Sequence, residues 1–348
     1  MRILYGINTN GQGHINRTAL IIDQLVKEGH RVDIVFSGPK PPDYAKKIAR
    51  NWMSVLGYRL IFRGKVFNMP GTLVENIRRL FYFPNEIKNL VTKVQKYSYD
   101  LILTDFDFYT SLTGKILKIP TIAVDHQHSL IHNKAIFPKN KRFDRIAVQL
   151  AVHLTVPHRD HYIAIDFADK IYSNSKGTLY PLIHKNDIDA FEVNAEDHYT
   201  IYLYSWPPRE LINFFTKYHK ENFHVFGYNV DLKYKNLIFK PTSRVGFLKD
   251  MTSSKGIITQ GGFSLIWEAA QIKKPVFAIP QINQFEQYIS AYRMSELELG
   301  YFAETLNTKD LDKFFEFSDK CNYKTSHKLP ILTVQKLTRT IMLIYNKL

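Results

Sequence analysis

The stretch that most constrains the fold is residues 257–287, IITQGGFSLIWEAAQIKKPVFAIPQINQFEQ. A short β-branched run leads into a glycine turn at 260–262, and the next nine residues suit a helix. Residues 275–279 then have the composition of a buried strand. Strand, glycine turn, helix and strand in this order predict a βαβ unit, and therefore a parallel α/β sheet.

The glycine turn of this unit is suited to binding an anion. Gly261 and Gly262 allow a sharp turn and leave unpaired N–H groups at a helix start, where the helix dipole also favours negative charge. Glu268 lies within the helix, where a carboxylate can bind a ribose hydroxyl pair. The order predicts a nucleotide-sugar site, although a Gly-Gly turn is also common in α/β proteins that bind no phosphate. The loop after the second strand adds three side chains suited to sugar hydroxyls: Gln284, Glu286 and Gln287.

The length and composition predict two ordinary globular domains. The chain has 348 residues, 45% of them hydrophobic, and no apolar run long enough to span a membrane. We expect an N-terminal domain over 1–195, a second domain over 196–330 that contains the predicted nucleotide-sugar site, and a C-terminal helix over 331–348. Met1 leads directly into a strand without a signal peptide, and the single cysteine, Cys321, fits a reducing compartment. These features predict a cytoplasmic protein.

The net charge of +15 indicates an anionic partner: a nucleotide, an acidic lipid surface or nucleic acid. Basic residues are concentrated between 40 and 96, where large aromatic and apolar residues lie among them. This mixture favours a membrane interface, with the rings in the headgroup layer. The alternative is that the aromatics form core and the cations a solvated face. The basic residues are Lys40, Lys46, Lys47, Arg50, Arg59, Arg63, Lys65, Arg78, Arg79, Lys88, Lys93 and Lys96.

The N-terminal segment predicts the start of a Rossmann-like domain. An apolar strand (2–7), a turn-rich loop (8–14), an amphipathic helix (15–27) and a second strand (31–36) follow one another. The loop contains G-x-G but no third glycine, and no acidic residue ends the second strand, so we exclude an NAD site. His14 lies in this loop, where it is either a general base in the cleft or a helix N-terminal residue that only packs.

Polar residues follow two further predicted strands, 100–104 and 120–124. Asp105 and Asp107 end the first, and residues 125–128, Asp-His-Gln-His, end the second. Such residues at strand ends are typical of a cleft, so we expect His126 and its neighbours to line the active site and Asp105 to cap the next helix or face the cleft. Neither set has a third ligand at metal-binding spacing, so we predict no metal site.

The intervening segments give weaker signals. We expect a helix at 43–52, a helical region at 72–95 broken near Pro84, and an interdomain linker at 176–198. The βα alternation restarts at 200–204, and residues 245–251 are expected to form a loop.

Four segments together resemble the GT-B glycosyltransferases that use UDP-sugars. They are NTNGQGHINR (8–17), DLILTDFDF (100–108), PTIAVDHQH (120–128) and the stretch 256–300. The group includes the lipid-linked GlcNAc transferase of peptidoglycan synthesis and uncharacterised bacterial and archaeal relatives. The resemblance implies two Rossmann-like doubly wound domains facing a cleft, with the C-terminal helix packed back on the N-terminal domain.

The resemblance also implies roles for individual residues. His14 matches a loop histidine that is a general base or acceptor-site residue, and Glu268 matches the ribose-binding acid. We also expect Asp105 and His126 to be catalytic. The sugar is implied to lie against Gln284, Glu286 and Gln287. Residues implied to contact the rest of the donor are Ser205 at the pyrophosphate, Phe247 and Leu248 around the uracil, and Gly261, Gly262, Phe263 and Ser264 at the phosphates.

The implied activity is an inverting, metal-independent transfer from a UDP-sugar to a hydroxyl of a lipid-linked or cell-envelope glycan. The UDP-sugar is a co-substrate, and no other cofactor is expected. The protein would work in the cytoplasm, peripherally at the inner face of the membrane. Two alternatives stay open: a nucleotide-sugar epimerase, which Asp105, Asp107 and Asp125 allow, and a nucleotide- or nucleic-acid-binding protein, which the charge allows.

Overall fold

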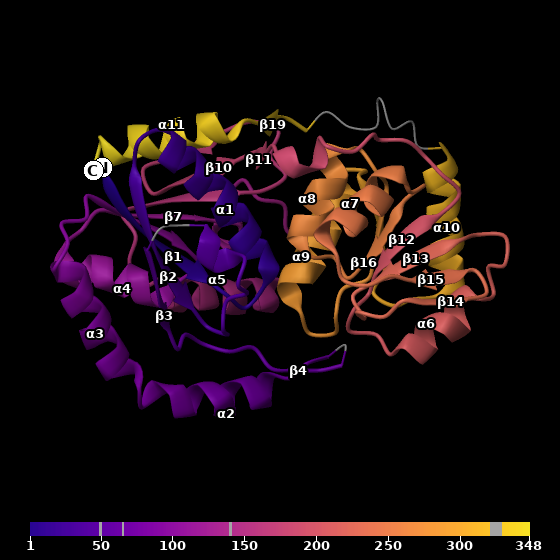
Figure 1. The fold of residues 1–348 in the computed structure, drawn as a ribbon, viewed down its shortest axis with the longest axis horizontal. Coiled ribbons are helices and arrows are strands. Elements are labelled where there is room, and N and C mark those ends of the chain that lie inside the picture. Colours follow the sequence, from indigo (N-terminus) through magenta and orange to yellow (C-terminus); the bar gives the residue numbers. More distant parts are fainter. Residues whose placement is uncertain (49–50, 65, 139–140, 321–328) are drawn as a thin grey trace. The chain divides into compact units, whose positions relative to one another are not determined.

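The computed structural model describes residues 1–48, 51–64, 66–138, 141–320 and 329–348 (Figure 1). The chain divides into two compact units. Unit 1 contains Met1–Ile61, Asn68–His184 and Leu329–Leu348, and unit 2 contains Phe62–Phe67 and Lys185–Lys328. Arg50 and Lys65 of the basic region, and Cys321, lie outside the described residues.

Unit 1 is built on an eight-stranded sheet in the order β3-β2-β1-β6-β7-β8-β10-β9. All pairings are parallel except that of β9 with β10. The central strands are buried along nearly their whole length, as expected where helices cover both faces of a sheet. The strands are β1 (Arg2–Asn8), β2 (Arg31–Ser37), β3 (Asn51–Val55), β6 (Leu101–Asp105), β7 (Thr121–Asp125), β8 (His161–Ile165), β9 (Tyr172–Ser173) and β10 (Gly177–Tyr180).

The helices of unit 1 are α1 (Gln12–Lys27), α2 (Met69–Leu80), α3 (Phe83–Gln95), α4 (Phe108–Leu117), α5 (Arg142–Thr155) and α11 (Val334–Tyr345). The α11 helix packs against α1, and the Thr338 hydroxyl donates to Glu28 Oε1 at 2.7 Å. The short strand β19 (Ile331–Leu332) precedes α11 and pairs with β11 (Leu182–Ile183). The predicted return of the C-terminal helix to the N-terminal domain is therefore confirmed.

Unit 2 repeats the plan with a seven-stranded sheet in the order β14-β15-β13-β12-β16-β17-β18. Its strands are β12 (Tyr199–Tyr202), β13 (Phe223–Phe226), β14 (Leu232–Tyr234), β15 (Leu237–Phe239), β16 (Ile257–Thr259), β17 (Val276–Ala278) and β18 (Gly300–Phe302). Its helices are α6 (Pro208–Phe215), α7 (Arg244–Ser253), α8 (Phe263–Gln271), α9 (Phe285–Glu296) and α10 (Thr308–Lys320). A small hairpin, β4 (Phe62–Arg63) with β5 (Val66–Phe67), also belongs to this unit. The predicted pair of doubly wound domains is confirmed.

In each sheet, strands are added on one side of the first strand and later on its other side, which makes a topological switch point. In unit 1 the chain moves from β1 to β2 on one side and later places β6 on the other side of β1. In unit 2, β13 and β16 flank β12 in the same way. Ligands of open α/β sheets bind in the crevice outside the carboxyl ends of the strands at such a switch point. We therefore expect ligands to bind at the loops after β1, β6, β12 and β16.

The helix predicted at 43–52 is wrong. The described residues of this segment contain one 3-10 turn, Ala45–Lys47, and then the start of β3. Strand β3 pairs in parallel with β2, with Trp52 opposite Ile34. Completing the sheet edge outweighs the local helical pattern, because hydrogen bonds and packing from a neighbouring strand can override intrinsic propensity.

The loop predicted at 245–251 is also wrong, because these residues lie in α7. The Ser243 side chain accepts a hydrogen bond from the Gly246 N–H at 3.1 Å, which caps the helix at its start. Leu248 and Met251 are buried, so packing stabilises a helix that Gly246 disfavours. The segment 176–198, predicted to be the interdomain linker, contains the change from unit 1 to unit 2 between His184 and Lys185, but it begins with the buried strands β10 and β11. Among the described helices, none combines the length and apolar character needed to span a bilayer.

Candidate active site

The switch point of unit 1 brings His14 and Asp105 together. His14 lies in the first turn of α1, and Asp105 is the last residue of β6. The distance from His14 Nδ1 to Asp105 Oδ1 is 2.7 Å, and the carboxylate is fully buried. A contact of this length to a carboxylate requires a proton on Nδ1, so the neutral imidazole keeps Nε2 as its proton acceptor. This is the geometry of an oriented general base.

Arg17, which sequence reasoning missed, is the second basic residue at this carboxylate. Its Nε donates to Asp105 Oδ2 at 3.0 Å and its Nη2 to Oδ1 at 2.6 Å. Thr18 Oγ1 donates to Oδ2 at 3.0 Å. Burial alone would lower the pKa of Arg17, but the Asp105 carboxylate more than offsets this and raises it. The i,i+3 spacing of His14 and Arg17, which places both on one helix face, was the available sequence signal.

One of the two predictions for Asp105 was that it caps the following helix, and this prediction is wrong. Asp107 is the N-cap of α4, and its carboxylate accepts the N–H groups of Tyr109 and Thr110. Burial raises the pKa of Asp107 despite these hydrogen bonds. The two aspartates therefore have different roles. Asp107 caps α4, and Asp105 accepts hydrogen bonds from side chains of α1.

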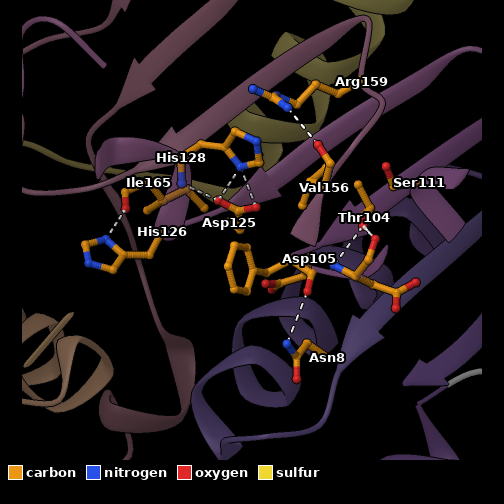
Figure 2. A network of polar contacts seen from close by, with 12 residues as sticks. Asn8, Thr104, Asp105, Ser111, Asp125, His126, His128, Val156, Arg159 and Ile165 are labelled. Carbon is orange, nitrogen blue, oxygen red and sulfur yellow. Dashed lines mark hydrogen bonds and ion pairs between the residues drawn. The ribbon is translucent and has the colours of Figure 1, made fainter. Parts of the chain in front are cut away.

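His126 takes part in a different cluster. Its Nδ1 lies 3.1 Å from the carbonyl oxygen of Ile165 and 3.9 Å from Asp166 Oδ1. Figure 2 shows its imidazole turned toward Ile165, away from Asp105. His128 instead lies against Asp125, with Nδ1 2.7 Å from Oδ2, and both side chains are fully buried. The structure thus brings Asp105, but not His126, into contact with His14.

The switch point of unit 2 joins Ser205 to the glycine turn. Ser205 N donates to Gln260 Oε1 at 3.2 Å, and Gln260 Nε2 donates to Ser205 Oγ at 2.6 Å. Gly261 has a φ of 81°, and a Cβ there would lie 2.9 Å from the carbonyl oxygen of Gln287, so only glycine fits. Gly262 is the N-cap of α8 and offers no capping side chain. The N–H groups at the start of α8 are therefore placed for an anion.

Two of the predicted phosphate-facing residues differ in their surroundings. Phe263 is buried, with its ring 5.8 Å from that of Trp267, and so contributes packing and its backbone N–H. Ser264 is only half-buried. Any direct side-chain contact with a phosphate at this turn would therefore come from Ser264 or Ser205.

Glu268, the predicted ribose ligand, is buried between two cations. Lys185 Nζ lies 2.7 Å from Oε1, and Arg244 reaches both carboxylate oxygens at 3.0 Å. Arg244 also pairs with Asp187 at 2.9 Å. Burial favours the neutral acid, but the attraction of Lys185 and Arg244 outweighs it and lowers the pKa of Glu268. A ribose that binds this carboxylate has to share it with, or displace, one of these cations.

The predicted uracil contacts lie on α7. Leu248 is part of the core of unit 2, whereas Phe247 is half-buried. The Phe247 ring packs edge-on against Tyr202, at 5.6 Å between centroids, and Phe226, at 5.2 Å. Tyr204, two residues beyond Tyr202, is half exposed and adds a further aromatic ring beside β12.

The predicted sugar loop forms the start of α9. Gln284 is the N-cap, and its side chain accepts from the Glu286 N–H at 3.3 Å. Gln287 exchanges two hydrogen bonds with Gln281: its Oε1 accepts the Gln281 N–H at 2.9 Å, and its Nε2 donates to Gln281 Oε1 at 3.0 Å. Gln281 also lines a pocket of about 350 Å³ at this edge of the sheet, together with Trp206 and other residues. These hydrogen bonds connect the loop to the first turn of α9.

One group in the described part of the chain has a metal-like composition: His198, His224 and Asp250 in unit 2. The two imidazole rings are stacked at 4.0 Å with an interplanar angle of 19°, and one nitrogen of each already contacts Asp250: His198 Nε2 lies 3.0 Å from its carbonyl oxygen and His224 Nδ1 2.9 Å from its Oδ2. Lys240 Nζ lies 2.6 Å from Asp250 Oδ2 and already neutralises that carboxylate. We therefore assign this cluster to the packing of β12, β13 and α7.

Solved glycosyltransferase structures share this fold over nearly the whole chain. The glycotransferase of kitacinnamycin matches with a TM-score of 0.64 over 98% of this chain and 98% of its own, at 13% identity. The spinosyn rhamnosyltransferase SpnG, complexed with thymidine diphosphate, matches with a TM-score of 0.61 over 98% and 100%, at 14% identity. MurG from Acinetobacter baumannii gives 0.59 over 100% and 99%, at 11% identity. The architecture is that of GT-B glycosyltransferases.

Sequence comparison identifies the family. Residues 1–318 match the family described as glycosyl transferase family 1. Because this match covers most of the chain, the protein belongs to glycosyl transferase family 1 and is a glycosyltransferase. The predicted resemblance is thus confirmed at the level of the GT-B class. No match is found among curated proteins.

Proposed function

We propose that the protein is an inverting, metal-independent glycosyltransferase that moves a sugar from a UDP-sugar to a hydroxyl of a lipid-linked or cell-envelope glycan. The observation that carries this proposal is the His14–Asp105 pair, 2.7 Å apart at the switch point of unit 1. The glycine turn and helix start at the equivalent point of unit 2 supply the complementary anion site.

The proposed reaction is a single displacement. His14 Nε2 takes the proton of the acceptor hydroxyl as its oxygen forms a bond to the anomeric carbon of the donor. The bond from that carbon to the UDP oxygen breaks, and the electron pair leaves with the diphosphate. The N–H groups at the start of α8 stabilise the growing negative charge, as the helix dipole does. Attack opposite to the leaving group inverts the anomeric configuration.

The donor is proposed to be a UDP-sugar because of the motifs in 256–300. Structural neighbours support a nucleoside diphosphate donor: VinC was solved in complex with dTDP, and Phytolacca americana UGT2 with UDP-2-fluoroglucose and pterostilbene. In this chain Glu268 would contact the ribose, and Gln284, Glu286 and Gln287 would contact the sugar. The two hydrogen bonds between Gln287 and Gln281 support a preorganised sugar site.

We also propose that the protein binds an anionic membrane surface. This proposal is supported by the surface of α2, which lies in the basic region 40–96. The described α2 residues include no buried one, and large apolar side chains recur along one face. Met69 is 70% exposed, Leu73 62% and Leu80 63%, and Phe81 just beyond the helix is 80% exposed. An exposed apolar stripe beside arginines suits an anionic bilayer surface, where a lipid-linked acceptor would be found.

The function is tested by incubating the protein with UDP-sugars and scoring UDP release with and without a lipid extract. Lipid-dependent UDP release with an inverted product linkage supports the proposal. Conversion of the UDP-sugar into an isomer without UDP release would instead establish an epimerase. Release of UDP that no acceptor stimulates would contradict the proposed transfer.

Membrane binding is tested separately by flotation with vesicles containing anionic phospholipid. The double variant Leu73→Gln/Leu80→Gln should bind several-fold more weakly, because each substitution removes an apolar anchor. Leu343→Gln is the matched control, since Leu343 on α11 is also 62% exposed but lies outside the basic region. Equal binding by both variants would contradict a role for α2.

A further inference from the structure

The carboxylate of Asp105 is saturated by one helix. His14, Arg17 and Thr18 all lie in α1, and together they donate four hydrogen bonds to its two oxygens. Oδ1 accepts from His14 Nδ1 at 2.7 Å and from Arg17 Nη2 at 2.6 Å, so the base and the guanidinium share one oxygen. The position of that oxygen, and hence of the imidazole, depends on both.

Arg17 also acts on His14 directly. Its Nη2 lies 3.3 Å from His14 Nδ1. Both atoms carry protons when Nδ1 donates to Asp105, so this contact is a repulsion between a cation and a proton-bearing nitrogen. Arg17 is only 2% exposed, and water therefore screens its charge weakly.

The buried charges at the base sum to nearly zero. Asp105 carries one negative charge and Arg17 one positive charge, 2.6 Å apart. A histidine beside an uncompensated carboxylate holds its proton tightly, because the pair becomes an ion pair. Beside a carboxylate already neutralised by arginine, the imidazolium gains much less. Such a base keeps the orienting hydrogen bond without an uncompensated negative charge beside it.

We propose that Arg17 is a positioning residue that fixes Asp105 and, by cancelling its charge, limits the basicity of His14. The assignment of His14 as the base rests on the proposed function. The other groups near the cluster act on it less directly. Phe106 stacks on the His14 ring at 6.4 Å and is uncharged, while Tyr5 of β1 and Asp125 of β7 act electrostatically on Arg17.

The test is a double-mutant cycle read by NMR titration of the His14 imidazole in the full-length protein, with His14→Gln identifying its signal. Arg17→Gln removes the compensating charge, so the His14 titration midpoint should rise by about one pH unit or more. Asp105→Asn leaves Arg17 alone beside the imidazole and should lower the midpoint. The double variant restores neutrality and should titrate close to the wild type.

Two further variants separate charge from shape. Thr18→Val removes one hydrogen bond to Asp105 without changing any charge, so its midpoint should stay near that of the wild type. Arg17→Lys keeps the charge but loses the two-pronged contact; its midpoint should move little, while turnover falls because the carboxylate is held less firmly. A midpoint that is the same in Arg17→Gln and the wild type, with circular dichroism unchanged, would overturn the proposal.

The double variant guards against misfolding of the single ones, because it buries no unpaired charge. If only the double variant folds, its own midpoint decides: a value far from that of the wild type would contradict the charge argument. The titration needs no substrate. A protein whose His14 titration follows the cycle but which turns over no UDP-sugar would refute the proposed function while leaving the role of Arg17 intact.

Discussion

Asp105 in unit 1 and Glu268 in unit 2 are both buried carboxylates with two basic partners. Asp105 contacts His14 and Arg17, and Glu268 contacts Lys185 and Arg244. The difference lies in the partners. His14 has a second ring nitrogen and a side chain that is 13% exposed, whereas Lys185 and Arg244 offer only donors.

This difference separates a cluster suited to proton transfer from one suited to holding structure. The first can accept a proton at His14 while its carboxylate stays fixed. The second connects α8 to Lys185 and to the first residue of α7. The Lys185 backbone and the Gln271 side chain exchange two further hydrogen bonds, at 2.9 and 3.0 Å, at the other end of α8. These contacts therefore hold α8 in place, and its N-terminus is where we propose that the diphosphate binds.

The largest expected effect is on turnover in unit 1. His14→Ala should lower kcat by about 10²–10⁴-fold, the usual contribution of a general base, while UDP binding is retained. The measurement is UDP release under saturating donor, with UDP affinity determined by calorimetry. Unchanged turnover would show that His14 is not the general base. The contrast drawn between the Asp105 and Glu268 clusters would then be wrong.

The next effect is on the stability of unit 2. Lys185→Met removes the buried cation at Glu268 and leaves the carboxylate with the partly exposed Arg244 alone. The loss of unfolding free energy should therefore be larger than that of a surface pair but below the about 3–5 kcal/mol of a buried charge left without any partner. Urea unfolding measures this loss. Lys27→Met is the matched control, because its pair with Asp23 is exposed and should contribute less than about 1 kcal/mol. Equal losses in both variants would contradict a clamping role for Lys185.

A third effect depends on pH. The pKa of Glu268 is lower in the folded protein than in the unfolded chain, so its contribution is complete above the unfolded pKa, about 4.3. That contribution is lost as the pH falls from there toward the folded pKa. The stability difference between wild type and Glu268→Gln should therefore shrink between pH 6 and pH 3. Unfolding curves at several pH values would refute this if the difference stayed constant.

The smallest effect is expected at the exposed side of the same cluster. Arg244 is 38% exposed and also pairs with Asp187 at the surface. Arg244→Gln should lower the unfolding free energy by only about 0.5–1 kcal/mol, because Lys185 still neutralises Glu268 and water screens the site. If the ribose has to displace Arg244, this variant should also bind UDP more tightly. Weaker UDP binding would show instead that Arg244 contacts the nucleotide.

The sequence predicted the main elements of both sheets, because their apolar strands and glycine turns are local patterns. It also predicted roles for His14 and Asp105, which the structure brings into contact, from their places after predicted strands. It missed Arg17. In the sequence this residue is one of several polar residues of an amphipathic helix, and only the structure shows its contact with Asp105 at the end of β6. It likewise gave no reason to pair Glu268 with Lys185, 83 positions away.

The failed predictions have the same origin. Residues 43–52 and 245–251 carry local patterns that a neighbouring strand and a buried helix face outweigh. The sequence by itself determined the class of fold, the two switch-point loops and the residues that line them, because βα periodicity and turn chemistry are written in short segments. Only the tertiary structure decided which charges meet, because ion pairs form between strands and helices that are distant in the chain and close only after packing.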